Sequence, residues 1–147
     1  MIQVLSDYPV TVEQPVVWGD LDPNGHVNNI GYFQYVENAR VALYQQIGKY
    51  DRGPEEGIIL VLASTSCQFK QALSFGDIVV TGVRISSVSE DRFTTSYRLV
   101  RKADRIIVAE AEAVSVAFDI HKKTKTPIPQ EVRERIAHLS AYKTVKS

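Results

Sequence analysis

The chain has 147 residues, of which 44% are hydrophobic, and this is enough for one domain with its own core. Seventeen lysines and arginines balance seventeen aspartates and glutamates, so the net charge is zero and there is no broad basic field for nucleic acid or an anionic membrane. No apolar run approaches the roughly 20 residues that cross a bilayer. The only cysteine, Cys67, cannot form an internal disulfide, and the N-terminus lacks the basic start and apolar core of a secretion signal. We therefore expect one cytoplasmic domain over residues 1–147.

The first regular elements are a strand and a long helix. Residues 10 to 18 alternate valines with other residues, which predicts a strand interrupted or edged by Pro15. From about 29 to 47, apolar residues cover nearly every side of a helical wheel, which predicts a helix buried all round. Either asparagine at 28 or 29 fits the N-cap, and Gly48 is placed to end the helix in a left-handed conformation.

The remaining elements are strands and a closing helix. Four runs alternate with period two, at roughly 58–69, 77–88, 92–102 and 105–119. Their short connections predict antiparallel pairing, with Phe93, Thr95, Tyr97 and Leu99 on one face of the third run and a row of alanines in the last. A strand, one long helix and four strands predict an α+β fold, with a five-stranded antiparallel sheet around the helix. Pro129 marks the start of a short amphipathic terminal helix.

A dense polar turn joins the first strand to the long helix. Between Trp18 and Arg40 the chain reads WGDLDPNGHVNNIGYFQYVENAR, in which two carboxylates, three asparagines and a histidine precede the apolar helix. A carboxylate beside the free N–H groups of a helix start can attack a carbonyl that those groups polarise, or activate water against it. We therefore place the candidate catalytic site here. The alternative is that Asp22 only begins an Asx-turn ahead of Pro23.

The turn resembles the signature of the 4-hydroxybenzoyl-CoA thioesterase-like branch of the hotdog superfamily, in which D-x-D-x-x-G precedes one long central helix. It also resembles the D-x-N-x-H-V-N-N pattern of plant acyl-carrier-protein thioesterases, matched by Asp22, Asn24, His26, Val27, Asn28 and Asn29. A second match lies at Phe69 and Phe75-Gly76-Asp77, which is similar to the family's F-x-x-P-x-x-Y-G-D connection between strands, with Ala72 at the proline position. The resemblance implies a hotdog fold and hydrolysis of an acyl thioester, aliphatic or aromatic, to a carboxylic acid and a free thiol.

The same resemblance assigns roles within the turn. It implies that Asp22 is the catalytic carboxylate, as nucleophile or as general base on water, and that the backbone N–H of Asn29 polarises the carbonyl. Asn24 and His26 match the residues that orient water or substrate in the plant enzymes, although His26 can equally cap the turn by bonding to backbone. Asp20 is expected to hold the loop through backbone hydrogen bonds. The chain departs from the aromatic-CoA thioesterase pattern at His26 and Asn29, and from that of the related bacterial short-chain thioesterases at Asn29, where they carry a histidine. Only the reaction type is therefore expected to carry over.

The thioester's thiol is expected to be coenzyme A or the pantetheine of a carrier protein. The densest positive cluster is HKKTK, where Lys122, Lys123 and Lys125 can meet phosphates as point charges, or can simply form a solvated edge. Coenzyme A is then substrate, and we expect no other cofactor. The resemblance implies a homodimer or homotetramer that pairs edge to edge, with the active site between subunits.

Three side chains have two interpretations each. Glu37 and Arg40 are charged residues on an apolar helix, and their spacing favours an ion pair between them, while Glu37 can alternatively line the acyl pocket of a partner subunit. Cys67 lies in an alternating strand pattern, which is typical of an inert thiol rather than a nucleophile.

Other classes fit the sequence less well. The hydratase signature D-x-x-x-x-H is absent, because three residues separate Asp22 from His26 and five separate Asp20 from it. The three histidines show no ligand spacing and have no second cysteine to assist them, so no metal site is expected. There is no G-x-S-x-G elbow or glycine-rich phosphate loop. A hotdog protein that binds an acyl thioester without hydrolysing it remains the alternative to an enzyme.

Overall fold

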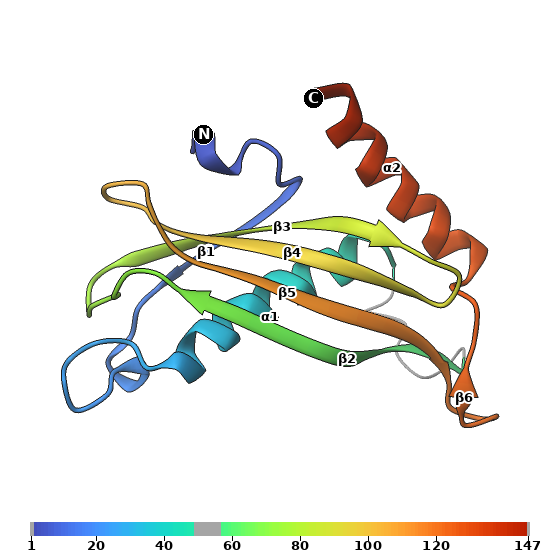
Figure 1. Cartoon of the computed structure of the whole chain (residues 1–147), viewed down its shortest axis with the longest axis horizontal. Coiled ribbons are helices and arrows are strands. Elements are labelled where there is room, and N and C mark those ends of the chain that lie inside the picture. The colour runs from blue at the N-terminus through green and yellow to red at the C-terminus, as the bar shows by residue number, and fades with distance from the viewer. Residues whose placement is uncertain (1, 49–56, 147) are drawn as a thin grey trace.

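The core of the protein is a curled antiparallel sheet with one long helix against it (Figure 1). The computed structural model describes residues 2–48 and 57–146. The strands are β1 (Val10–Pro15), β2 (Ile58–Phe69), β3 (Ile78–Val88), β4 (Arg92–Arg101), β5 (Ile106–Asp119) and the two-residue β6 (Thr124–Lys125), and the helices are α1 (Asn29–Gln46) and α2 (Gln130–Lys146). Short 3-10 turns occur at Gln3–Leu5 and Trp18–Asp20. The α+β prediction and the five long strands are confirmed.

The strand order is β1-β3-β4-β5-β2, and β6 pairs with β5 outside this path. All neighbouring strands are antiparallel, as the short connections between β3, β4 and β5 require. The strands at the two edges are therefore β1 and β2. Two loops lie at the same end of the sheet, the turn between β1 and α1 and the β4–β5 hairpin, while β6 lies at the other end (Figure 1).

The inner face of the sheet and one face of α1 form the main core. Phe93, Tyr97 and Leu99, which the sequence places on one face of their strand, are almost fully buried, and they belong to one cluster with Val36 and Leu43 of α1. The row of alanines in β5 is buried in the same cluster. A second, smaller cluster covers the outer face, where the N-terminal segment packs on β3 and β4. None of the helices in the described ranges is long and apolar enough to cross a membrane.

Two sequence predictions about these elements need correction. The first strand ends at Pro15 instead of residue 18. The N–H of Val16 still continues the ladder to β3 by donating to the carbonyl of Asp77 at 2.8 Å, but the 3-10 turn at Trp18–Asp20 then takes the chain out of the extended conformation. The long helix is not buried all round. The sheet covers only one side of it, so Ile30 on the other side is 72% exposed.

The predicted ion pair between Glu37 and Arg40 is also wrong. Arg40 points into the core with 8% of its surface exposed, where its guanidinium lies 5.9 Å from the ring centroid of Tyr97 and donates to the hydroxyl of Tyr97 at 3.4 Å. Glu37 is exposed and accepts a hydrogen bond from the side chain of Gln34 at 3.0 Å. The two charges lie on different faces of α1, so the favourable i to i+3 spacing is not used.

Candidate active site

The polar turn folds back on itself as a short loop. Leu21 bridges Val27, the N–H of Asp22 donates to the carbonyl of His26 at 2.8 Å, and Gly25 adopts a φ of 83° at the bend. A positive φ of this size favours glycine, because other residues place a Cβ against the backbone there. The loop therefore has a fixed shape determined by its own sequence.

The carboxylate of Asp22 is held by this loop. Its Oδ1 accepts hydrogen bonds from the N–H of Asn24 at 2.8 Å and the N–H of His26 at 3.3 Å, which form the Asx-turn considered above as the alternative role of Asp22. Within the described residues the second oxygen, Oδ2, has no hydrogen-bond partner. The structural role of Asp22 thus uses one oxygen and leaves the other available for chemistry.

The start of α1 supplies free donors beside this carboxylate. Asn28 is the N-cap, and its side chain accepts from the N–H of Gly31 at 3.1 Å. The N–H groups of Asn29 and Ile30 have no acceptor among the residues that the structure describes. Such orphan donors, at the positive end of the helix dipole, are the groups that stabilise a developing oxyanion.

Asp22 and Asn29 open onto one cavity of about 490 Å³. Its lining consists of Asp22, Val27, Asn28, Asn29, Tyr32, Phe69, Lys70, Gln71 and Ala72. Asn24 and His26 are exposed and are not part of this lining, so a single chain does not bring them to the cavity. Lys70 is a lining residue that sequence reasoning missed, and it forms an ion pair of 3.0 Å with Glu110.

The wall opposite the helix start is formed by the connection from β2 to β3. The ring of Tyr32 meets the ring of Phe69 edge to face at 5.2 Å, and its hydroxyl donates to the carbonyl of Gln71 at 2.8 Å. The N–H of Val27 donates to the carbonyl of Leu73 at 2.9 Å, which joins the turn to the same connection. Phe69 thus gives the cavity an apolar side suited to an acyl group.

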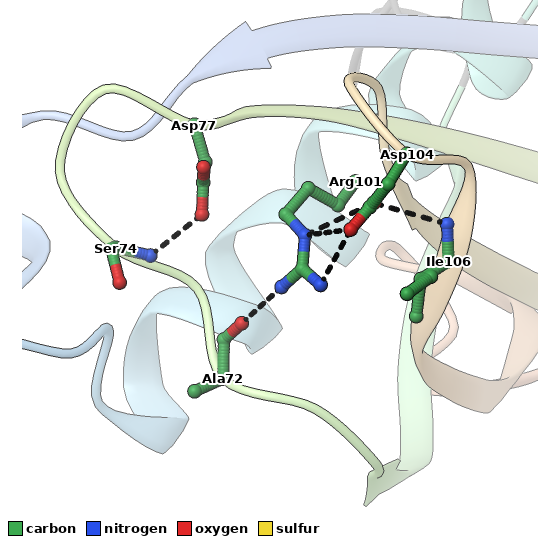
Figure 2. A network of polar contacts seen from close by, with 6 residues as sticks. All are labelled: Ala72, Ser74, Asp77, Arg101, Asp104 and Ile106. Atoms are coloured by element: carbon green, nitrogen blue, oxygen red, sulfur yellow. Dashed lines mark hydrogen bonds and ion pairs between the residues drawn. The ribbon is translucent and has the colours of Figure 1, made fainter.

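A polar network holds this connection in place (Figure 2). Arg101 donates to the carbonyl of Ala72 at 2.8 Å and pairs with Asp104 at 2.9 Å, and its guanidinium lowers the pKa of the Asp104 carboxyl. Asp77 accepts from the N–H of Ser74 at 2.9 Å within the same loop. The β4–β5 hairpin therefore supports the cavity wall from behind, although none of its residues lines the cavity.

Asp20 holds the turn from its other side. Its Oδ2 accepts from the N–H of Val17 at 3.1 Å, which confirms the predicted backbone role, and also from the hydroxyl of Tyr35 at 2.8 Å. Burial of the phenol, together with this hydrogen bond, raises the pKa of Tyr35. The carbonyl of Asp20 accepts from the N–H of Asn28 at 3.1 Å, so one residue connects the loop, the helix cap and the helix face.

The lysines of the HKKTK segment lie far from this cavity within one chain. Lys122, Lys123 and Lys125 are exposed and follow the C-terminal end of β5, whereas the cavity residues Lys70 and Gln71 donate their backbone N–H groups to the carbonyl of Val108 near its N-terminal end. A strand rises about 3.3 Å per residue, so β5 separates the two sites by some tens of ångströms. A single chain therefore does not bring these lysines to Asp22.

Gly31 allows the turn to pack closely on the helix. A Cβ at this position would lie 2.6 Å from Cγ1 of the buried Val27. We expect Gly31→Ala to destabilise the protein by about 1–2 kcal/mol, because the overlap outweighs the better helix propensity of alanine. We also expect slower turnover, because moving the turn changes the position of Asp22 relative to Asn29. Denaturant unfolding checks the first effect. The double variant Gly31→Ala/Val27→Ala should be less destabilised than the sum of the single changes, and strict additivity would contradict the packing explanation.

Cys67 is partly buried on β2, and burial raises the pKa of its thiol to about 11. At pH 8 only about one thiol in a thousand is then ionised, against about a quarter at the ordinary pKa of 8.5. We expect the native protein to react slowly with a disulfide reagent and Cys67→Ser to retain full activity. Rapid titration of the thiol in the folded protein, or loss of turnover in the serine variant, would show that Cys67 is a reactive group.

A curled antiparallel sheet around one long helix, with an acidic turn at the helix start, defines a hotdog-fold protein. The chain belongs to the Thioesterase-like superfamily, whose family model matches residues 16–136. It is therefore a member of a family of thioester hydrolases.

Individual relatives agree with this assignment. A thioesterase from Thermus thermophilus, solved in complex with coenzyme A and Zn, is 29% identical, with a TM-score of 0.81 over 92% of this chain and 97% of that one. The chloroplastic acyl-acyl carrier protein thioesterase ATL3 of Arabidopsis thaliana is 28% identical over 120 residues, which are 81% of this chain and 63% of that protein. A thioesterase superfamily protein from Jannaschia sp. CCS1, 24% identical over 95% of this chain and 88% of that one, shares the fold with a TM-score of 0.86.

Proposed function

We propose that this protein hydrolyses an acyl-CoA thioester with Asp22 as its catalytic carboxylate. The observation that carries the proposal is that Asp22 and Asn29 line the same cavity, and that the N–H of Asn29 has no acceptor among the described residues. The 29% identical thioesterase solved with coenzyme A supports coenzyme A as the thiol.

The chemistry follows from these two groups. The thioester carbonyl accepts a hydrogen bond from the Asn29 N–H, which stabilises the negative charge that develops on its oxygen. The carboxylate then acts in one of two ways. As nucleophile, it adds to the carbonyl and expels the CoA thiolate, and water hydrolyses the resulting anhydride. As general base, it takes a proton from water that attacks the carbonyl directly. Both routes give one carboxylic acid and one free thiol from one thioester and one water.

An acyl-carrier-protein ester is the second candidate substrate. It is favoured by the 28% identity to a plant enzyme named for that substrate and by the matching asparagine and histidine, Asn24 and His26. The assay that separates the candidates is thiol release from short, long and aromatic acyl-CoAs and from the corresponding acyl-carrier proteins. We expect turnover of CoA esters. Turnover of carrier-protein esters alone would favour the second candidate, and saturable binding without turnover of either would indicate a sensor.

We further propose that the functional unit is a dimer formed by the free edge of β2. This strand pairs only with β5 among the described strands, and its twelve residues, IILVLASTSCQF, carry no charge. A long uncharged edge strand is a template for pairing unless something covers it. If two copies of β2 pair antiparallel about a two-fold axis, the Ile58 end of one strand lies beside the Phe69 end of the other.

Such pairing gives the HKKTK segment a function. Ile58 pairs with Asp119 of β5, so Lys122, Lys123 and Lys125 follow immediately beyond the Ile58 end of β2. Across a β2–β2 interface that end lies near the partner's cavity, because Phe69 is a cavity residue. We propose that these lysines bind the phosphates of the coenzyme A held by the partner subunit. Glu37, on the exposed face of α1, then lies on the side of the helix open to a second copy.

A further inference from the structure

Two large aromatic side chains stand exposed at the outer rim of the polar turn. Trp18 is 73% exposed and Phe75 is 58% exposed. Their ring centroids are 4.9 Å apart and their planes meet at 89°, so together they form an open corner. Aromatic rings of this size gain most of their stabilisation from burial, and an exposed pair marks a surface that binds something.

The corner lies on the same rim as Asp22. Ser74, the neighbour of Phe75, forms a β-bridge with His26, and Trp18 begins the 3-10 turn that ends at Asp20. Neither ring belongs to the lining of the cavity that holds Asp22 and Asn29. A thioester has two arms, and the apolar side of the cavity, with Tyr32 and Phe69, suits the acyl arm. The corner is therefore placed for the end of the other arm.

The carboxylates of the two loops that form the corner do not oppose an anionic ligand. Asp20, two residues after Trp18, and Asp77, two residues after Phe75, each accept a hydrogen bond from a backbone N–H group of their own loop. Their negative charge is therefore partly compensated within the fold.

We propose that the corner formed by Trp18 and Phe75 is the binding site for the adenine base of coenzyme A. A base that stacks on one ring presents its edge to the other, and stacking of this kind is a general mode of binding nucleic-acid bases. The proposal rests on the proposed function, since it takes a CoA ester as substrate. It makes coenzyme A, rather than a carrier protein, the preferred thiol, because a carrier protein presents no adenine.

Trp18 is the only tryptophan of the chain, so its fluorescence reports this site directly. We expect coenzyme A and adenosine 3′,5′-bisphosphate to quench the emission saturably, and pantetheine, which lacks the base, to leave it unchanged. Phe75→Ala should weaken both titrations. The proposal would be overturned if pantetheine quenched the emission as strongly as coenzyme A does. It would also be overturned if the emission changed with protein concentration but not with nucleotide, because the corner would then be a contact between copies of the chain.

Kinetics give a second readout. We expect Trp18→Ala to raise KM for an acyl-CoA by about 5- to 150-fold, the loss that corresponds to one stacked base, with little change in kcat. KM for the matching acyl-pantetheine should stay the same, and Trp18→Phe should restore most of the affinity for the CoA ester. An equal rise in KM for both esters would show that Trp18 only supports the fold. If no CoA ester were hydrolysed but adenosine 3′,5′-bisphosphate still quenched Trp18, the proposed function would fail while the adenine site stood.

Discussion

Replacing Asp22 with asparagine is expected to reduce the rate of thioester hydrolysis by about 10²- to 10⁴-fold, the range typical for loss of a positioned acid-base group. The amide keeps the shape of the side chain, and its Oδ1 still accepts from the N–H groups of Asn24 and His26. The Asx-turn and the helix start should therefore remain intact. What the variant loses is the negative charge of the free oxygen on the cavity.

The measurement is thiol release by wild type and Asp22→Asn on the best acyl-CoA of the panel, together with denaturant unfolding of both proteins. Asp7→Asn is a matched control, because Asp7 is a carboxylate of the N-terminal segment with no role in the turn. We expect its activity and stability to match wild type. Hydrolysis by Asp22→Asn at the wild-type rate would remove Asp22 from the mechanism. A large loss of stability in the same variant would mean that its loss of activity reports folding.

The strands and the helix were predictable because each has a strong local signal. The period-two runs predicted β2 from 58 to 69 and the other three strands to within a residue, since successive side chains of a strand point to opposite faces of the sheet, and in β4 and β5 one of these faces is largely buried. The ends of α1 were also predictable, because Asn28 caps it and Gly48, with a φ of 77°, ends it. The errors lie where tertiary contacts decide. β1 stops early because the chain enters the 3-10 turn at Trp18–Asp20, in which Asp20 accepts a hydrogen bond from the hydroxyl of Tyr35 on α1.

The site was only partly predictable for the same reason. The turn with Asp22 and the helix start with Asn29 are adjacent in sequence, so their meeting needs only local geometry. Lys70 and Gln71 reach the cavity from a connection that follows another strand, and no pattern in the turn points to them. The match at Phe69 was the one signal that this connection belongs to the site. The position of Arg40 depends on Tyr97, which is 57 residues away, so helix spacing alone gave the wrong partner.

Replacing Leu62 with lysine should convert a dimer into monomers and greatly reduce activity. Leu62 lies near the middle of β2 and is 42% exposed. About a two-fold axis the middle of one β2 strand meets the middle of the other, so two new lysines would approach each other, and like charges on facing strands are destabilising. Activity should fall because monomers separate the cavity of one copy from Lys122, Lys123 and Lys125 of the other.

Val88→Lys is the matched control for this test, since Val88 is 40% exposed but lies at the end of β3, away from the β2 edge. Light scattering after size exclusion gives the mass of each protein, and thiol release gives its KM and kcat. We expect wild type and Val88→Lys to be dimeric or tetrameric and active, and Leu62→Lys to be monomeric with a raised KM for acyl-CoA. A wild type that is monomeric at full activity would show that one chain contains a complete site. A monomeric Leu62→Lys that keeps the wild-type KM would show that substrate binding does not depend on the interface. The phosphates of coenzyme A would then have to be bound by cations of the same chain, such as Lys70 beside the cavity.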